Sequence, residues 1–206
     1  MSLDSLLRER PDLWRGGDRN RATGSELLAS GHADLDRILG GGWPRGALSE
    51  ILSPAQGLMA LGLLLPALAR LSREGRWIAW IDPPQLPYAP GLAARGIELP
   101  RLLLLHTPGP DDGLWTLEQA LGSGGCAAVL AWPRALPGQA LRRLQLAAEA
   151  GRAMGWLFRP PAAARELSPA ALRLRVQPRA DGGTAVEVLK RRGGWSRGAI
   201  SLPAGA

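Results

Sequence analysis

From residue 47 to residue 159, short runs of consecutive apolar residues alternate with longer amphipathic stretches, and this alternation most constrains the fold. The apolar runs predict strands at residues 47–52, 76–81, 102–105, 126–131 and 155–159. The stretches between them predict helices at residues 57–73, 89–95, 113–122 and 138–153. Strands that are apolar throughout are typical of parallel sheets whose two faces are both covered by helices. We therefore predict an α/β fold, a three-layer sandwich with a mainly parallel central sheet.

The last quarter of the chain follows a different pattern. Residues 170–177 and 184–190 alternate apolar with polar side chains, and the turn-forming sequence P-R-A-D-G-G lies between them. Such alternation around a D-G-G turn predicts an antiparallel hairpin, and a third strand at 197–202 is expected to follow it. Because Arg173 and Arg175 are two residues apart, we expect both to project from the same solvent-facing side.

The N-terminal residues are expected to lie outside this core. Residues 2–10 predict a short amphipathic helix through Leu3, Leu6 and Leu7, and the polar, glycine-rich residues 15–24 predict a flexible linker. We therefore divide the chain into an N-terminal helix with its linker (residues 1–24) and a core domain (residues 25–206). The helix is either a docking segment for a partner or a simple tail.

The formal charge of +7 is confined to the last quarter of the sequence. Residues 1–150 hold 15 Arg and 15 acidic residues, whereas residues 151–206 hold ten basic and three acidic residues. A basic field at one end favours an acidic partner or nucleic acid. The alternative is a basic end that is merely solvated.

Several classes of site are not expected from this sequence. Cys126 is the one cysteine, and His32 and His106 lie far apart without neighbouring ligands, so we expect no disulfide and no metal site. No apolar stretch reaches the roughly 20 residues that span a bilayer, and the first ten residues do not resemble a signal peptide. A cytoplasmic protein without membrane contact is predicted.

Residues 31–52, G-H-A-D-L-D-R-I-L-G-G-G-W-P-R-G-A-L-S-E-I-L, resemble the entry to the RecA fold. In that fold the phosphate loop G-x-x-x-x-G-K-[ST] follows, in which backbone N–H groups and the Lys hold the phosphates and the hydroxyl binds Mg²⁺. Here the residues are S-P-A-Q-G-L-M-A (53–60), one residue short. Ser53 replaces the first Gly, Gly57 remains, and Leu58 and Met59 occupy the Lys and Ser/Thr positions.

Two further positions of the RecA-type nucleotide site are also changed. Pro84 stands where the resemblance implies a catalytic Glu after the second core strand, and Trp132 stands where it implies an Asp that supports Mg²⁺. The loss of the cation, the metal ligands and the water-activating group together predicts a degenerate P-loop. We expect a RecA-like protein that is not an enzyme and binds no nucleotide cofactor.

Four segments resemble the ImuA family: residues 40–52, 76–84, 96–103 and 153–160, the last reading A-M-G-W-L-F-R-P. The last three also resemble the shorter cell-division inhibitor SulA, but the glycine-rich entry and the basic C-terminal strands favour ImuA. This resemblance implies a non-catalytic adaptor of SOS-induced translesion DNA synthesis. Its implied partners are an ImuB-type, Y-family polymerase-like protein, an error-prone DnaE-type polymerase and, as a further contact, RecA. The alternative is a SulA-like division inhibitor that binds FtsZ.

Candidate contact residues fall into three groups. Arg159, Arg165, Arg173 and Arg175 are candidates for weak, salt-sensitive contact with DNA. Lys190, Arg191 and Arg192 either serve a partner or DNA, or solvate the end of a hairpin. Trp43, Trp115 and Trp195 lie in turns or near helix starts and are candidate exposed anchors, whereas Trp77, Trp80 and Trp156 lie in strands and are expected in the core.

Overall fold

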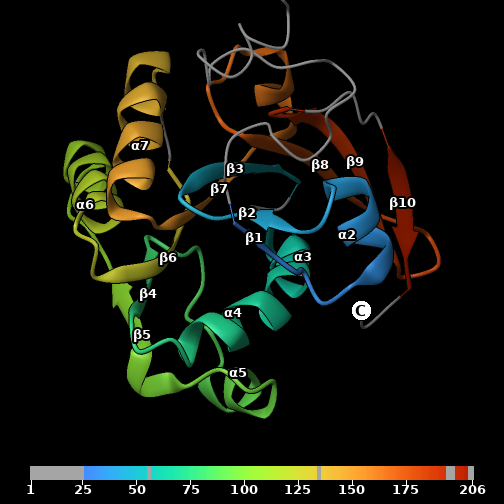
Figure 1. Ribbon diagram of the computed structural model, residues 1–206, viewed down its shortest axis with the longest axis horizontal. Helices are drawn as coiled ribbons and strands as arrows, with labels where there is room; N and C mark the ends of the chain where they lie inside the picture. Colours follow the sequence, from blue (N-terminus) through green and yellow to red (C-terminus); the bar gives the residue numbers. More distant parts are fainter. Residues whose placement is uncertain (1–25, 55–56, 134–135, 194–197, 204–206) are drawn as a thin grey trace, which may run out of the picture.

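The computed structural model describes residues 26–54, 57–133, 136–193 and 198–203. The predicted N-terminal helix and linker, and Trp195, lie outside these residues. Within the described residues, one eight-stranded sheet runs through the molecule in the order β10-β9-β8-β3-β7-β6-β4-β5 (Figure 1). Its strands, in sequence order, are β3 (Ala47–Leu52), β4 (Trp77–Ile81), β5 (Leu102–Leu105), β6 (Cys126–Ala131), β7 (Met154–Arg159), β8 (Leu172–Pro178), β9 (Thr184–Arg191) and β10 (Ala199–Leu202).

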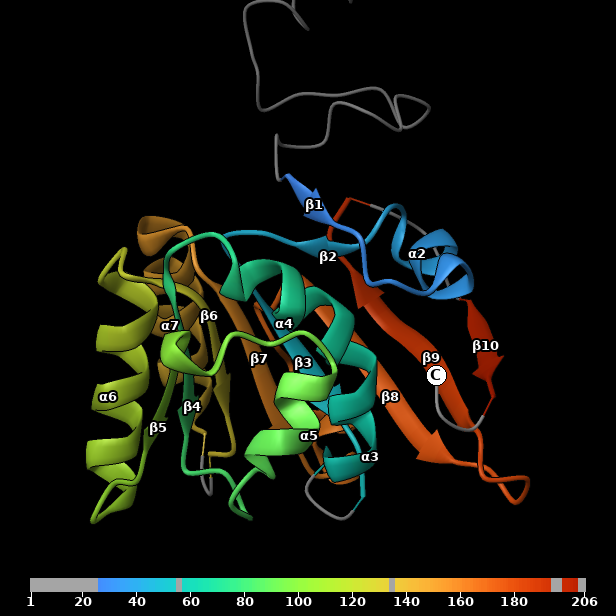
Figure 2. The same ribbon diagram turned by 90° about the horizontal axis from the view of Figure 1, so that it is seen from below.

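From β8 to β5 in the sheet order, each strand pairs parallel with the next. For β3, β7, β6, β4 and β5 this is the arrangement predicted from their continuous apolar runs. The C-terminal strands β8, β9 and β10 pair antiparallel, so the predicted hairpin and its third strand are also present (Figure 2). A separate two-stranded sheet joins β1 (Leu27–Leu28) to β2 (Trp43–Pro44). The predicted fold class, an α/β protein of RecA-like architecture with an antiparallel C-terminal end, is confirmed.

Helices cover both faces of the sheet (Figure 1). On one face lie α2 (Ala33–Leu39), α4 (Leu65–Ser72) and α5 (Ala89–Ala94), whose apolar side chains belong to one buried cluster. On the other face lie α6 (Pro110–Gly122) and α7 (Gly138–Gly151), whose apolar side chains belong to a second cluster. Alternate residues of the central strands point into the two clusters, which explains why these strands are apolar throughout.

The predicted helix at residues 57–73 is interrupted. It consists of α3 (Leu58–Leu61), a 3₁₀ turn η2 (Gly62–Leu64) and α4 (Leu65–Ser72). Pro66 lies in the first turn of α4, where its missing N–H costs nothing, but in a continuous helix it would break a hydrogen bond. Pro66 therefore explains the interruption, which the apolar pattern of residues 57–73 does not indicate.

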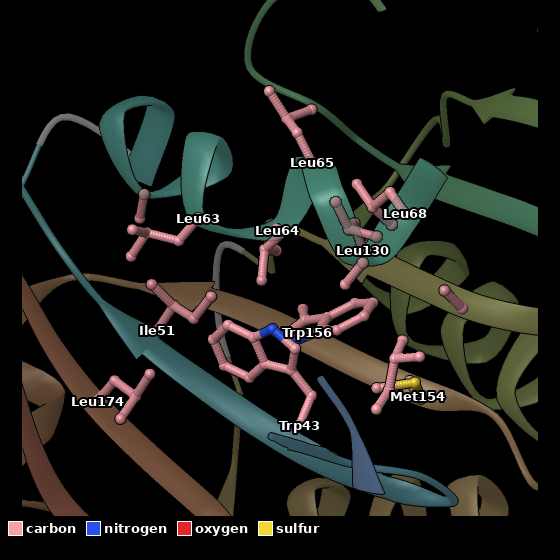
Figure 3. Close-up of a cluster of buried hydrophobic side chains, with 14 of the residues drawn as sticks. Trp43, Ile51, Leu63, Leu64, Leu65, Leu68, Leu130, Met154, Trp156 and Leu174 are labelled. Carbon is pink, nitrogen blue, oxygen red and sulfur yellow. The ribbon is translucent and has the colours of Figure 1, made fainter. Parts of the chain in front are cut away.

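Trp43 lies at the centre of the larger cluster, where its side chain is completely buried (Figure 3). The glycines at positions 40–42 turn the chain after α2, so that β2 runs back over the sheet and carries Trp43 inward. The ring meets that of Trp156 edge-on, with centroids 5.8 Å apart and planes at 89°, an arrangement that aromatic pairs favour. The expectation that Trp43 is an exposed anchor is therefore wrong, whereas Trp80 and Trp156 are buried as predicted.

Candidate protein-binding surface and degenerate nucleotide site

The degenerate phosphate loop follows β3 at the carboxyl edge of the sheet. Ser53 is buried, and its hydroxyl donates to the carbonyl of its neighbour Pro54 at 3.3 Å. Gly57 precedes α3 with a φ of 73°, and a Cβ at this position would lie 2.3 Å from the ring of Phe158. The loop thus packs directly onto Phe158, and neither Leu58 nor Met59 brings a cation or a hydroxyl to it.

Aromatic rings fill the adjacent part of this edge. Phe158 stacks on Trp132, with centroids 4.5 Å apart and planes at 3°, and Trp132 also contacts Trp80 at 5.9 Å. Trp132 occupies the position where a RecA-type ATPase would carry an acidic residue, and it is almost fully buried. Among the described residues, no group of three His, Cys, Asp or Glu side chains could hold a metal ion. The local chemistry is that of a hydrophobic core.

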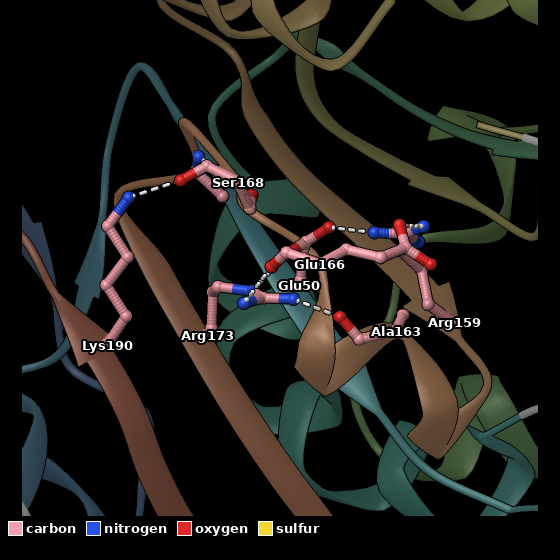
Figure 4. Close-up of polar contacts among 8 residues, drawn as sticks. Glu50, Arg159, Ala163, Glu166, Ser168, Arg173 and Lys190 are labelled. Atoms are coloured by element: carbon pink, nitrogen blue, oxygen red, sulfur yellow. Dashed lines mark hydrogen bonds and ion pairs between the residues drawn. The ribbon is translucent and has the colours of Figure 1, made fainter. Parts of the chain in front are cut away.

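Two of the arginines proposed as DNA contacts are instead buried around Glu50 (Figure 4). Arg159 donates to Glu50 Oε1 at 2.7 Å and to Glu166 Oε2 at 2.6 Å, while Arg173 pairs with the other oxygen of Glu50. Burial acts to lower the pKa of Arg159, but the bonds with Glu166 and Glu50 outweigh it and raise that pKa. The expectation that Arg173 projects from the solvent-facing side is wrong, because both guanidiniums are buried and pair with Glu50, a carboxylate from the middle of the sheet.

The other cations of the C-terminal strands also have partners within the chain. Lys190 donates to the Ser168 carbonyl, Arg191 to the Leu39 carbonyl at the end of α2, and Arg192 pairs with Glu149 of α7 at 3.0 Å. Burial lowers the pKa of Lys190, and the nearby Arg192 and Arg173 lower it further. These three consecutive residues therefore tie the end of β9 to three different parts of the fold.

The positive charge of the last quarter of the chain is thus partly neutralised by acidic residues that are distant in the sequence but close in the fold. Glu50 and Glu149 belong to the net-neutral first 150 residues, yet both pair with C-terminal arginines. Arg175 pairs with Glu187 across the hairpin at 2.6 Å. Arg165 is exposed at the end of a short 3₁₀ turn, η4 (Pro161–Arg165). A contact role for Arg165, Arg175 and the cluster at 190–192 stays a prediction.

Several exposed apolar side chains come from the edge strand β5 and from elements that precede or follow it in the chain. Among the described residues, Trp77, Leu86, Tyr88, Leu104 and Trp115 are exposed large hydrophobics, and all come from β4, the loop that follows it, β5 or α6. We call these five residues the β5-edge surface. Trp115, which is 64% exposed, has the exposure expected of an anchor, whereas Trp77, expected in the core, is 38% exposed.

This surface also carries a positive charge. The guanidinium of Arg101 lies over the ring of Trp77, 5.6 Å from its centroid, in a cation–π contact. β5 has no neighbour on its outer side among the described strands, so its backbone N–H and C=O groups face outward there. Exposed aromatic residues next to an unpaired strand edge are typical of protein-binding surfaces. Sequence reasoning missed most of this surface, because Leu104 is one of four consecutive leucines that together predict a buried strand.

The fold and these sites define a class: a RecA-like α/β protein that has lost its nucleotide chemistry and keeps an exposed apolar surface. Comparison with known proteins narrows this class. The family described as cell division inhibitor SulA matches residues 46–155. The chain belongs to the SulA cell division inhibitor family, which is a family of inhibitors and not of enzymes.

Two relatives found by sequence agree with this assignment. The cell division inhibitor SulA of Pectobacterium carotovorum (strain PC1) is 34% identical over 137 residues, which is 66% of this chain and 79% of the relative. That of Cronobacter turicensis is 35% identical over 144 residues, covering 69% and 84% of the two chains. The crystal structure of SulA from Pseudomonas aeruginosa has 32% sequence identity and a TM-score of 0.46, and covers 55% of this chain and 97% of that one.

The expectation of an ImuA-type translesion adaptor is therefore wrong, and so are the partners it implied: an ImuB-type protein, an error-prone DnaE-type polymerase and RecA. The separate expectation of weak DNA contact, which came from the basic residues, is also not what this family supports. Three of the four segments that suggested ImuA are shared with SulA. The C-terminal strands that favoured ImuA lie outside residues 46–155, and so does the glycine-rich part of the N-terminal entry at residues 40–42. Within the described residues, no helix has the length and apolarity needed to cross a bilayer.

Proposed function

We propose that this protein inhibits bacterial cell division by binding FtsZ in the cytoplasm, and that it is produced in response to DNA damage. The observation that carries the proposal is the match of residues 46–155 to the cell division inhibitor SulA. The degenerate nucleotide site supports it, because an inhibitor that acts by binding needs no catalytic chemistry of its own. Its activity then depends on an accessible surface.

We propose the β5-edge surface as the contact with FtsZ. Its elements β4, β5 and α6 all lie within residues 46–155, the part matched to SulA. Tyr88 and Trp115 are 75% and 64% exposed, so each can bury a large ring in an interface without unfolding anything. Buried aromatic residues commonly contribute most of the free energy of binding at such interfaces.

Binding of purified FtsZ to the immobilised protein tests this proposal. We expect a direct complex, and we expect Tyr88→Ala and Trp115→Ala each to weaken it about tenfold, which corresponds to roughly 1.4 kcal/mol. Leu167→Ala is the matched control, because Leu167 is 96% exposed but lies between β7 and β8, several strands away from β5. A complex that Leu167→Ala weakens as much as Trp115→Ala would place the contact elsewhere.

The timing of production is tested in the bacterium itself. The transcript and the protein should rise after treatment with a DNA-damaging agent such as mitomycin C, and division should stop while growth continues. Cells that lack the gene should then form fewer filaments under the same treatment. Constant levels of the protein before and after damage would contradict this part of the proposal.

A further inference from the structure

A small cavity of about 60 Å³ opens at the carboxyl ends of β4 and β6, next to the first turns of α6. Its walls include Asp82, which follows β4, Trp132, which follows β6, and Leu114 and Leu117 of α6. Thr107, in the loop after β5, completes the polar side. None of these residues belongs to the β5-edge surface, so the cavity is a separate feature of the molecule.

The position of the cavity in the topology is one at which ligands commonly bind. From β4 the chain continues to α5 on one face of the sheet, whereas from β5 and β6 it continues to α6 and α7 on the other face. In open α/β sheets, ligands bind outside the carboxyl ends of the strands where neighbouring connections leave to opposite faces. Figure 2 shows β4 and β5 next to α6 at this side of the molecule.

The carboxylate of Asp82 is held in a fixed orientation within this cavity. Its Oδ1 accepts the backbone N–H of Thr107 at 2.8 Å, and its Oδ2 accepts the Thr107 hydroxyl at 2.6 Å. Its backbone has a φ of 49°, a left-handed conformation that non-glycine residues adopt mainly where surrounding contacts enforce it. Each carboxylate oxygen keeps a second lone pair, so Asp82 can accept two more hydrogen bonds.

The charge of the site favours a cation. Among the described residues, the lining contains no Lys or Arg, and Asp82 is its one formally charged member. Asp111 and Asp112 lie in the first turn of α6. Asp112 is close to the lining residue Gly109, because a Cβ added to that glycine would lie 3.3 Å from Asp112 Oδ2. The N-terminus of α6 adds roughly half a positive charge, which three carboxylates outweigh. An anionic ligand is therefore disfavoured here.

The size and the lining residues of the cavity limit the chemical class of the ligand further. The cavity has a volume of about 60 Å³, which suits a small group of a few heavy atoms. A planar guanidinium fits this description, because it can donate two parallel hydrogen bonds to one carboxylate. Its apolar stem can then lie along Leu114 and Leu117, with the indole of Trp132 as an aromatic wall. We propose that this cavity binds a guanidinium group, with Asp82 as its counter-ion.

Titration of the full chain with Nα-acetyl-L-arginine amide, followed by calorimetry and by NMR of the indole N–H groups, tests the proposal. We expect binding by the wild-type protein and no binding of the neutral isostere Nα-acetyl-L-citrulline amide. Asp82→Asn should weaken binding about tenfold, because a hydrogen bond to a charged group is replaced by a neutral one. Asparagine also tolerates a positive φ and can keep both bonds to Thr107, so this variant should fold.

Asp111→Asn is the matched control, because it makes the same chemical change as Asp82→Asn at a carboxylate in the first turn of α6 that does not line the cavity. It should change the affinity by about twofold at most, since exposed charges are screened by salt. Equal binding of the arginine and citrulline probes, or an unchanged affinity in Asp82→Asn, would overturn the proposal. Arg134 follows the lining residue Pro133, so binding confined to Arg134→Ala would also overturn it, by showing that the chain's own arginine occupies the cavity.

The guanidinium could belong to a free small molecule or to an arginine of a partner protein, and FtsZ binding distinguishes these two sources. If a partner arginine enters the cavity, Asp82→Asn weakens the FtsZ complex and the arginine probe competes with it. If the ligand is a free molecule, the FtsZ complex is unchanged while the probe still binds. The probe titration needs no FtsZ, so its outcome is independent of the proposed inhibition of division.

Discussion

The carboxylate of Glu50, which is fully buried, lies between the guanidiniums of Arg159 and Arg173, which are each less than a tenth exposed (Figure 4). The three side chains come from β3, β7 and β8, and Arg173 also donates to the carbonyls of Ala163 and Glu166. The cluster therefore joins the hairpin to the parallel part of the sheet and fastens the segment between β7 and β8. One carboxylate balances two buried cations, with Glu166 as a half-exposed second partner of Arg159.

Glu50→Gln should destabilise the fold strongly. The substitution keeps the shape of the side chain but leaves two buried guanidiniums without their shared counter-ion, which should lower the free energy of unfolding by about 3 kcal/mol or more. Urea denaturation followed by far-UV circular dichroism measures this. Glu166→Gln is the control: its carboxylate is 52% exposed, so we expect a loss of about 1 kcal/mol or less. Equal effects of the two substitutions would contradict this interpretation of the cluster.

Arg76→Ala should destabilise the contact between α7 and the amino ends of β4 and β6. The Arg76 guanidinium donates to the carbonyls of Gly151 and Arg152 at the end of α7, at 2.9 and 3.4 Å, and to those of Gly124 and Cys126. A cation that lies at a helix C-terminus and donates hydrogen bonds to several carbonyls should contribute about 2 kcal/mol to the free energy of unfolding.

Thermal and urea unfolding of three variants test this role of Arg76. Arg76→Lys should recover only part of the loss, because an ammonium cannot reach four carbonyls as a forked guanidinium does. Arg95→Ala, at an exposed position, should change stability by about 0.5 kcal/mol at most. Full recovery by lysine would show that charge alone matters at this position.

The turn of the β8–β9 hairpin should show an unusually acidic carboxyl group. The hydrogen bond from Arg179 and that from the backbone N–H of Gly183 lower the pKa of Asp181 from 3.8 to about 2. Because the pKa in the folded state is depressed, the stabilisation by this carboxylate is present above pH 3.8 and is lost as the pH falls through about 2. An NMR titration of the Asp181 side-chain carbon measures this pKa directly.

Arg179→Ala is the informative variant for that titration. It removes the first of the two causes, so the pKa of Asp181 should rise back towards its ordinary value while the bond from Gly183 remains. A pKa that does not change in Arg179→Ala would show that the guanidinium does not contact the carboxylate in solution.

ATP should not bind, and restoring the missing side chains should not restore binding. Calorimetry with Mg-ATP should give no signal for the wild-type protein, because it lacks the cation and the hydroxyl of a phosphate loop. The double variant Leu58→Lys, Met59→Thr should also give none, since Gly57 packs onto Phe158 and the edge of the sheet is filled by stacked rings. Saturable binding of Mg-ATP by either protein would contradict this interpretation.

The sequence predicts the strands well and the environment of charged residues poorly. β3 and β6 begin and end where their apolar runs do, because strands buried on both faces leave an unbroken signal. The alternation of the hairpin correctly places Arg173 and Arg175 on one side, but nothing near them in the sequence reveals that Glu50, more than 100 residues away, draws Arg173 inward. The helix α6 begins at Pro110, three residues earlier than predicted, because proline is well accommodated in a first turn.

The same limit applies to the functional surface. Aromatic residues in turns look exposed in a sequence, yet Trp43 is buried by the return of β2 over the sheet. Leu104 looks buried in its apolar run, yet it is partly exposed, and it lies in β5, the last strand of the described sheet. Trp77 is also partly exposed, at the first residue of β4. Which strand forms the edge is a property of the strand order, and periodicity carries no information about that order.

The most direct test of the central claim is the sedimentation of FtsZ polymers formed with GTP, in the presence of increasing amounts of this protein. We predict that the pelleted fraction of FtsZ falls as the protein approaches equimolar amounts, and that Trp115→Ala shifts this effect to higher concentration while Leu167→Ala does not. A pelleted fraction that stays constant at a large excess of the wild-type protein would contradict the proposed inhibition of division.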